Sequence, residues 1–260
     1  MKDSLKLNAR RALAAAKWPR MVFYRGKYLF LLSHMRARSS LLSHILGSNQ
    51  EICGYKEENR SYPNNRSLLF LRMRLMVNSE EYKLTNETNY FMDKIVHNKF
   101  EISPKILERE NTRAILLVRE PVGTYQSMIR LARLRKIDAY ANIDIFADSY
   151  VQRLEKLVEY SVEMKKRALY VDSDSLLDNI GPTLKNISTN LNLSIPLSDQ
   201  YQQFKDTGRP FSGDSSESIK RGCIFKPKYD TESHSVPEIC HVAYETCVAE
   251  IENNSIKINA

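Results

Sequence analysis

Several common signals are missing from this 260-residue sequence, and each absence narrows what the protein can be. No apolar run approaches the roughly 18 residues of a membrane-spanning helix, and the N-terminus lacks the continuous apolar segment of a secretory signal. The cysteines have neither metal-site spacing nor the density of a disulfide framework; they are Cys53, Cys223, Cys240 and Cys247. The glycine-rich nucleotide fingerprints G-x-x-x-x-G-K-[ST] and G-x-G-x-x-G are also missing. We therefore expect a cytoplasmic protein with reduced thiols and no metal.

Positive charge is what the sequence does have. Its 39 Lys and Arg residues outnumber its 31 Asp and Glu residues, for a formal net charge of +8. This balance suits an anionic ligand, a nucleic acid or a membrane surface, and does not choose among them. A hydrophobic content of 42%, with only 8 Gly and 9 Pro, is typical of a globular, helix-rich protein. The length fits one α/β domain over residues 1–260.

Apolar runs typical of buried strands alternate along the chain with segments of helical periodicity. Strands are predicted at 28–32, in a short segment ended by Gly54, and at 89–97, 113–118 and 168–171. Helices are predicted at 65–77, from Pro104 onward, and at 121–131, 143–166, 184–191 and 236–251. This order predicts an α/β fold with a central parallel sheet of about five strands and helices on both faces.

Residues 1–20 and 198–228 lie outside this alternation. The first segment mixes basic and small apolar residues, which predicts a basic helix. Such a helix lies on a membrane surface or packs on the domain or on a partner chain; we favour packing, because charge runs are usually solvated helix faces. The second segment is rich in Gly, Ser and Pro and is predicted to be irregular.

The segment 29–46, LFLLSHMRARSSLLSHIL, is the most informative part of the sequence. An apolar strand runs through a short polar turn into a helix that begins at Arg38 or Ser39. Backbone N–H groups and the positive helix end then converge on one point, which attracts anions. Arg36, Arg38 and two serines crowd the same turn and match the donors that phosphate or sulfate prefers. The alternative is an ordinary crossover with solvated arginines.

A second anion-binding pattern follows the strand at 113–118. Arg119 stands where this strand ends, and Ser127 lies about two turns into the helix that opens at Pro121. Ligands of open α/β sheets gather at the carboxyl ends of the strands. An Arg at a strand end and a Ser on the next helix can therefore grip one phosphate from two sides.

These patterns resemble, in the same chain order, the cofactor-binding motifs of sulfotransferases that use 3′-phosphoadenosine 5′-phosphosulfate (PAPS). In the family's 5′-phosphosulfate loop, a basic residue, one or two small residues and a hydroxyl pair open the first helix. Carried over, this loop consists of Arg36, Ala37, Arg38, Ser39, Ser40 and Leu41, with Arg36 as the basic residue and the two serines as the hydroxyl pair. Arg38 stands where the family usually has Gly, and a positive φ would be costly there for Arg.

The resemblance extends to the 3′-phosphate and to the reaction. Arg119 and Ser127 match the residues that hold the cofactor's 3′-phosphate, and Lys220, Arg221 and Gly222 match a late basic-Gly loop that folds over the nucleotide. The resemblance implies a P-loop-like sulfotransferase fold. It also implies transfer of a sulfuryl group from PAPS to a hydroxyl or amine of a small molecule, without a metal. The product would be adenosine 3′,5′-bisphosphate.

Such a reaction needs a base for the acceptor proton, and two residues are candidates. Glu57 follows the Gly54 turn, where several bacterial members of the family carry Glu. His97 ends the segment DKIVH, which is loosely similar to the Lys-Thr-His strand of animal members, with Lys94 as a contact for the leaving group. Because Lys94 and His97 are three positions apart, we expect one of them to point away from the site. We favour Glu57 as the base and keep His97 second.

Glu57, Glu58 and Asp93 place negative charge near the expected acceptor, which favours a cationic small molecule. Guanidinium toxins of the saxitoxin type, sulfated in secondary metabolism, are one such class. The alternative function is a basic protein that binds nucleic acid or a membrane surface on the same scaffold, although no aromatic residues are interleaved with the basic ones for base stacking. We expect a small-molecule acceptor, no nucleic acid and no stable membrane insertion, and leave a homo-oligomer open.

Overall fold

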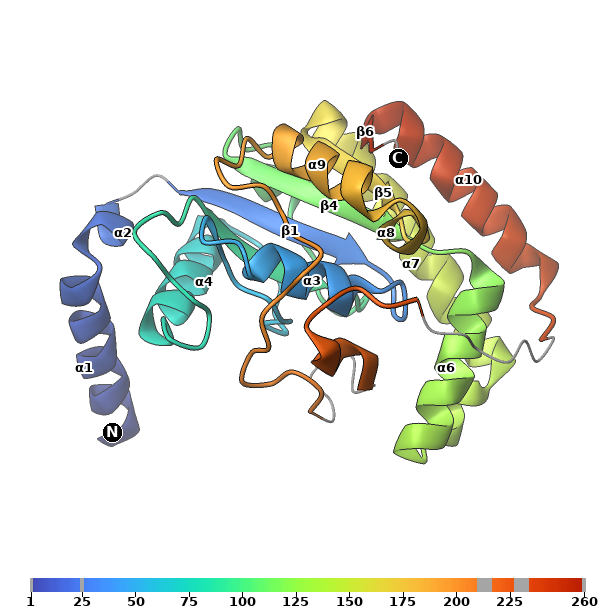
Figure 1. The fold of residues 1–260 in the computed structure, drawn as a ribbon, viewed down its shortest axis with the longest axis horizontal. Coiled ribbons are helices and arrows are strands. Elements are labelled where there is room, and N and C mark those ends of the chain that lie inside the picture. Colours follow the sequence, from blue (N-terminus) through green and yellow to red (C-terminus); the bar gives the residue numbers. More distant parts are fainter. Residues whose placement is uncertain (1, 24–25, 210–216, 227–233, 259–260) are drawn as a thin grey trace.

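A computed structural model describes residues 2–23, 26–209, 217–226 and 234–258. In this part of the chain, one all-parallel sheet has the strand order β2-β3-β1-β4-β5-β6 (Figure 1). The strands are β1 (Lys27–Ser33), β2 (Ile52–Cys53), β3 (Tyr90–Ile95), β4 (Thr112–Val118), β5 (Ala168–Asp172) and β6 (Ile256–Lys257). The predicted α/β architecture with a central parallel sheet is confirmed.

Helices cover both faces of the sheet. They are α1 (Lys2–Lys17), α2 (Pro19–Phe23), α3 (Ser39–Gly47), α4 (Asn65–Val77), α5 (Pro104–Leu107), α6 (Pro121–Arg135), α7 (Ile143–Met164), α8 (Ser175–Asp178), α9 (Ile180–Asn190) and α10 (Glu238–Asn254). Three 3₁₀ turns join them: η1 (Asp138–Ala141), η2 (Lys165–Arg167) and η3 (Glu217–Arg221).

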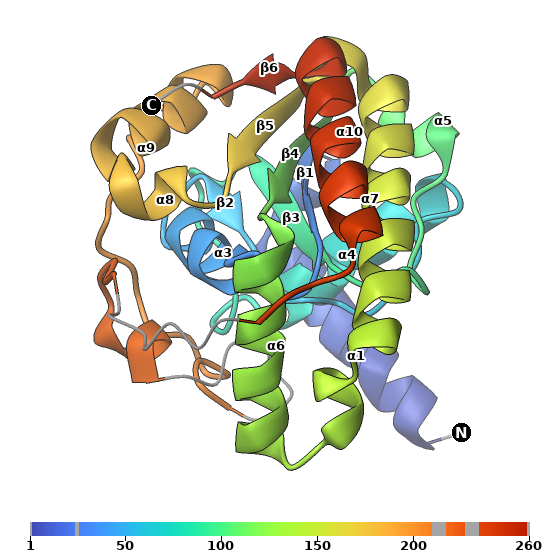
Figure 2. The same ribbon diagram turned by 90° about the vertical axis from the view of Figure 1, so that its right-hand side faces the viewer.

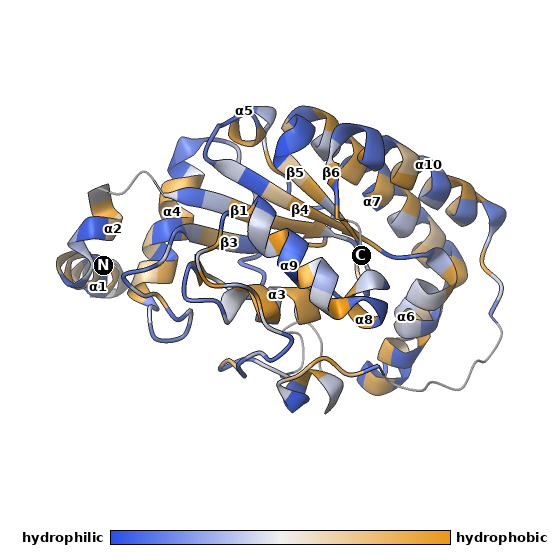
Figure 3. Cartoon of the chain, turned by 45° about the horizontal axis from the view of Figure 1, so that its top comes forward, coloured by the Kyte–Doolittle hydropathy of each residue, from blue (hydrophilic) through white to orange (hydrophobic). Residues whose placement is uncertain are grey.

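Alternation of side chains along the strands builds two cores. Tyr28, Phe30 and Leu32 of β1 face α4, α5, α7 and α10, whereas Leu29 and Leu31 face α3, α8 and α9. Figure 2 shows α7 and α10 side by side on one side of the sheet and α3, α8 and α9 on the other. The apolar strands lie between these layers (Figure 3). Burial on both faces explains why the central strands β1 and β4 are mainly apolar in the sequence, from Tyr28 to Leu32 and from Ala114 to Val118.

Tertiary contacts explain two of the differences from the predictions. β3 ends at Ile95 rather than His97, since the Ile95 carbonyl accepts from the Arg153 side chain at 2.6 Å. The two-residue β6 has no apolar run to reveal it and forms as Ile258 N donates to the Tyr170 carbonyl at 2.9 Å. The basic N-terminal helix breaks at Trp18 into α1 and α2.

Helix α1 packs against α4, in line with the packing that we favoured for the N-terminal segment. The Arg10 guanidinium donates to Asn78 Oδ1 at 3.4 Å, and the guanidinium carbon of Arg11 lies 6.0 Å from the centre of the Phe70 ring. Within the described residues, no helix is both long and apolar enough to span a membrane.

The strand order places a switch point at β1. After β1 the chain moves through α3 to β2 and β3 on one side, and then crosses to β4 on the other side. The connections that leave β1 and β4 therefore diverge, which opens a crevice at the carboxyl ends of these strands. Both sequence motifs for anion binding end at this crevice.

Two glycines test how tightly α3 is packed. A Cβ on Gly47 would lie 2.5 Å from the Gly54 carbonyl oxygen and 2.8 Å from Tyr55 Cβ, whereas a Cβ on Gly181 in α9 would meet nothing within 4 Å. We expect Gly47→Ala to lower the free energy of unfolding by about 1–3 kcal/mol through overpacking. Gly181→Ala should raise it by up to about 1 kcal/mol through helix propensity. Denaturant unfolding of both variants checks this, and equal effects would contradict the packing described.

Candidate functional site

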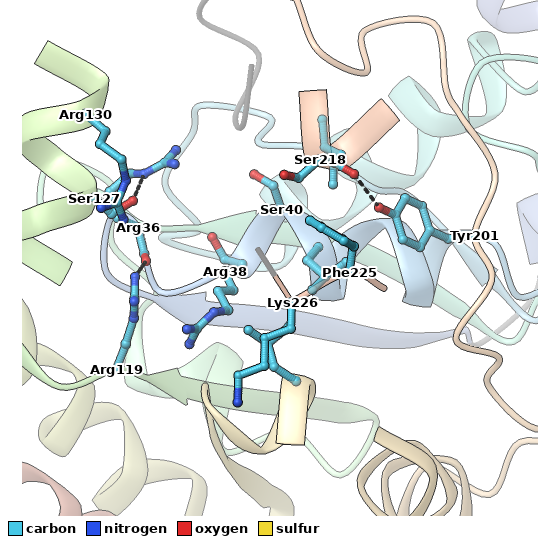
Figure 4. A pocket seen from close by; sticks show the side chains of 14 residues that line it. Arg36, Arg38, Ser40, Arg119, Ser127, Arg130, Tyr201, Ser218, Phe225 and Lys226 are labelled. Carbon is cyan, nitrogen blue, oxygen red and sulfur yellow. Dashed lines mark hydrogen bonds between the residues drawn. The ribbon is translucent and has the colours of Figure 1, made fainter. Parts of the chain in front are cut away.

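A cavity of about 280 Å³ opens at the carboxyl ends of β1 and β4. Seven of the residues predicted to bind the cofactor line it: Arg36, Arg38, Ser39, Ser40, Leu41, Arg119 and Ser127. Ala37, from the same loop, is fully buried beneath it. Figure 4 shows α6 and the loop after β1 on one side of this cavity and Ser218 of η3 on the other. The fold thus brings together two motifs that are about 80 residues apart in the sequence.

Arg36 joins the two motifs directly. Its Nε donates to Ser127 Oγ at 2.9 Å, and its carbonyl oxygen accepts from Arg119 Nη1 at 3.3 Å (Figure 4). Arg36 and the pair Arg119 and Ser127 were predicted to bind different phosphates of one cofactor. In the structure they form one hydrogen-bonded group.

The loop after β1 is held in an unusual backbone conformation. Arg36 and Arg38 both have positive φ, 65° and 62°, and α3 begins directly after Arg38. Arg38 therefore adopts the left-handed conformation that suits the Gly found there in the resembled family, at a cost that Gly would not have. Arg38 Nη1 lies 2.6 Å from Asp174 Oδ1 and 2.8 Å from Ser173 Oγ. These contacts from the junction of β5 and α8 hold the loop in place.

His34 connects the two loops and was not identified from the sequence. Its Nε2 accepts from the Arg119 backbone N–H at 3.0 Å, so its proton resides on Nδ1, which donates to the Met35 carbonyl at 2.9 Å. Burial lowers the pKa of His34 to about 4, and the ring is therefore neutral at pH 7. A histidine in a polar turn gives no sequence signal for such a buried bridge.

Positive charge dominates the lining of the cavity. The cations are Arg36, Arg38, Arg119, Arg130 and Lys226. Burial, and then neighbouring Arg38, lower the pKa of Arg119 to about 10, which leaves it charged at pH 7. Arg119 Nε is buried without a hydrogen-bond partner among the described residues. Arg130 was missed, although it follows Ser127 by three positions and so shares its helix face.

Helix α3 adds backbone donors to these cations. Its first intrahelical bond runs from Leu42 N to the Arg38 carbonyl, so the helix itself provides no acceptor for the N–H groups of its first turn. No group of His, Cys, Asp and Glu in the described part of the chain has the arrangement of a metal site. The lining suits an anion with several oxygen atoms.

The three residues predicted to act in catalysis lie in one line of contacts. Glu57 Oε1 lies 3.3 Å from Lys94 Nζ, and Glu57 Oε2 lies 3.6 Å from His97 Nε2. Lys94 Nζ also donates to Ser40 Oγ, in the loop after β1, at 3.1 Å. The prediction that Lys94 or His97 points away is wrong, because β3 ends at Ile95 and the alternation of a strand does not extend to His97.

This line of contacts ends at a second cavity, of about 80 Å³. We call it the inner cavity; it is lined by His34, Met35, Val96, His97, Asn98, Thr124, Met128, Phe146, Ser149, Tyr150 and Arg153. Chiefly because of burial, the pKa of His97 is lowered from its ordinary value, with Glu57 opposing the shift, so His97 is neutral at pH 7. The contacts Ser40–Lys94–Glu57–His97 thus lead from the cationic cavity to the inner one.

The other two carboxylates predicted near the acceptor are engaged elsewhere. Buried Glu58 is bonded to Arg74 and Tyr82. Asp93 accepts from the Tyr62 hydroxyl at 2.6 Å and from two backbone N–H groups, and burial raises its pKa to about 7. Of the three carboxylates on which we based a cationic acceptor, only Glu57 contacts the side chains of Lys94 and His97, and Lys94 pairs with it.

The late basic-Gly motif lies beside the cationic cavity rather than in its lining. The guanidinium carbon of Arg221 lies 3.8 Å from the centre of the Phe225 ring, and the Gly222 carbonyl accepts from Tyr201 N at 2.7 Å. Lys220 and these two residues are not among the lining residues; Ser218, Ile219, Phe225 and Lys226 are. Gly213 to Ser216, in the irregular segment that precedes this motif, lie outside the described residues.

Comparison with protein families and with curated proteins finds no relative. No protein-family model matches the chain, and no curated protein is significantly similar to it. The case for a function therefore rests on the residues and geometry described above.

The strain at Arg38 can be measured with two variants that lose the same side-chain contacts. Arg38→Ala and Arg38→Gly both remove the contacts with Asp174 and Ser173, but only Gly relieves the positive φ. We expect Arg38→Gly to be more stable than Arg38→Ala by about 1 kcal/mol. Denaturant unfolding measures the difference, and the same two residues compared at position 181 should show the opposite order. Equal stability of the two Arg38 variants would contradict a strained loop.

Proposed function

We propose that this protein is a PAPS-dependent sulfotransferase, acting in the cytoplasm on a hydroxyl or amine of a small molecule. The observation that carries the proposal is the position of the Ser40–Lys94–Glu57–His97 contacts. They link a cationic cavity, lined by both predicted phosphate motifs, to a separate inner cavity. A donor nucleotide and an acceptor would thus meet across one line of catalytic groups. The sulfotransferase fold named by the resemblance is part of the same proposal.

The cationic cavity has the charge and donors for a nucleotide with two phosphate groups. Arg36 and the first turn of α3 would hold the 5′-phosphosulfate, and Arg119, Ser127 and Arg130 would hold the 3′-phosphate. Arg119 Nε, which has no hydrogen-bond partner among the described residues, is a donor that such an anion would satisfy. PAPS, when bound, supplies an activated sulfuryl group whose leaving group is the nucleotide 5′-phosphate.

Sulfuryl transfer, like phosphoryl transfer, depends on position and on stabilised charge. The acceptor oxygen or nitrogen forms a bond to sulfur as the bond from sulfur to the 5′-phosphate oxygen breaks, and the acceptor loses its proton. Lys94 is 3% exposed and bonded to Ser40, so it can place a positive charge near the departing phosphate oxygen.

The proton has two routes, and the geometry favours His97 as its first acceptor. His97 lines the inner cavity and is neutral at pH 7, as a base must be. Glu57 contacts both His97 and Lys94, which suits a group that orients His97 and stabilises its protonated form. This order is the reverse of the one that we favoured from the sequence.

Arg119 offers the sharpest test of the nucleotide site. Adenosine 3′,5′-bisphosphate should raise the melting temperature of the protein well above the effect of ATP, adenosine 5′-phosphate or an oligonucleotide. Arg119→Ala should weaken its binding at least about tenfold, the worth of one charge-assisted hydrogen bond. Arg133→Ala, which removes an exposed arginine of α6, is the control. Preference for the oligonucleotide would favour the alternative of a nucleic-acid-binding protein.

Single-turnover kinetics distinguishes the role of His97 from that of Glu57. We expect His97→Ala to slow sulfuryl transfer by about 10²–10⁴-fold with unchanged binding of adenosine 3′,5′-bisphosphate. Glu57→Gln keeps the shape of the side chain but removes its charge, and should slow transfer less and shift the pH profile of the rate. If Glu57→Gln abolishes transfer while His97→Ala stays near the wild type, Glu57 is the base.

A further inference from the structure

The inner cavity has a distinctive charge. None of its lining residues is Asp or Glu, and both of its histidines, His34 and His97, are neutral at pH 7. Arg153 is therefore the charged residue of the lining. Burial lowers the pKa of Arg153 to about 10, against the opposing effects of the Tyr160 hydroxyl and Glu57, and it stays protonated at pH 7. A cation entering this cavity would meet a like charge.

Arg153 is held in place by two strand-end carbonyls and by the Tyr160 hydroxyl, and one of its nitrogens has no partner among the described residues. The side chain is 2% exposed; its Nε donates to the Ser33 carbonyl at 2.8 Å and its Nη2 to the Ile95 carbonyl at 2.6 Å. These carbonyls end β1 and β3. The third nitrogen, Nη1, is buried and has no hydrogen-bond partner among the described residues. A buried charged donor without a partner is costly, and a ligand oxygen would remove that cost.

The other polar groups of the lining do not compete for this role. The hydroxyls of Thr124, Ser149 and Tyr150 donate to the backbone carbonyls of Glu120, Phe146 and Arg119. Asn98 Oδ1 is buried without a partner in the described chain, and the Asn98 amide carries no charge. Met128 and Phe146 supply apolar surface. The cavity thus presents one cationic donor within an apolar wall, beside the candidate base His97.

We propose that the inner cavity receives a carboxylate of the acceptor, which Arg153 binds, so that the preferred acceptors are small hydroxylated acids rather than cations. This inference rests on the proposed sulfotransferase function. It accounts for a buried arginine that the transfer step itself does not use, and it replaces the acceptor class that we expected from Glu57, Glu58 and Asp93.

The test compares three phenols that differ in charge: 4-hydroxybenzoate, 4-methylphenol and 4-hydroxybenzylamine. Calorimetry with the full chain and saturating adenosine 3′,5′-bisphosphate gives their dissociation constants without any need for turnover. We expect 4-hydroxybenzoate to bind at least about tenfold more tightly than 4-hydroxybenzylamine, with 4-methylphenol between them. Equal or tighter binding of the amine, or no measurable binding of 4-hydroxybenzoate, would overturn the proposal.

Three variants test whether the preference for the acid arises in the inner cavity. Asn98→Asp introduces a carboxylate into the inner cavity. It should weaken the binding of 4-hydroxybenzoate at least about tenfold and strengthen the binding of 4-hydroxybenzylamine. Gln152→Glu adds the same charge at an exposed position of α7 and should change neither by more than about twofold. Arg153→Lys, checked for folding by its melting temperature, should also lose the preference for the acid. An unchanged preference in Asn98→Asp would place the acid elsewhere and overturn the proposal.

Transfer is then followed separately with PAPS. Tight binding of 4-hydroxybenzoate without sulfation would leave the charge preference of the cavity in place and count against the sulfotransferase function. Sulfation of the amine in preference to the acid would support the function and overturn the acceptor class.

Discussion

The backbone of the loop after β1 is the constraint on which the whole site depends. Arg36 and Arg38 are both in the left-handed region, which turns the chain sharply between the end of β1 and the start of α3. In this conformation the Arg36 carbonyl meets Arg119 and the Arg36 side chain meets Ser127. Such a conformation persists only when its surroundings hold it. Here Ser173 and Asp174 hold Arg38, and Ser173 Oγ also donates to the Ala37 carbonyl.

Electrostatics divides the site into two regions of different character. The cationic cavity collects arginines from the loop after β1, from the end of β4 and from α6, and their mutual repulsion is relieved when an anion binds. The inner cavity is smaller and more apolar, with a single charged side chain that has already been removed from water. Lys94 and Glu57 lie between them as an ion pair. Charge separation of this kind suits a reaction in which negative charge moves to a leaving phosphate and a proton moves the other way.

Much of the fold could be predicted, because its strands are buried on both faces and its helices are amphipathic. β4 is a continuous apolar run from Ala114 to Val118, and α4 has the bounds that its periodicity indicates. The cationic loop between β1 and α3 could be predicted too, since strand, turn and helix are consecutive in the chain and their charges are local. The sequence could also have identified Arg153 as unusual. It lies among the core positions Tyr150, Leu154 and Leu157 of α7, where a charge is unexpected.

The sequence by itself determined the parallel α/β architecture and the cluster of positive charge at the ends of β1 and β4, since both follow from patterns between near neighbours in the chain. Only the tertiary structure decided that Lys94, Glu57 and His97 form one line of contacts, and that Glu58 and Asp93 are engaged away from it. These outcomes depend on where β3 ends and on which buried groups find partners. Hydrogen bonds between distant residues determine where β3 ends and which buried groups are paired. One example is the bond from Arg153 to the Ile95 carbonyl, and no local pattern in the sequence encodes a partner 58 positions away.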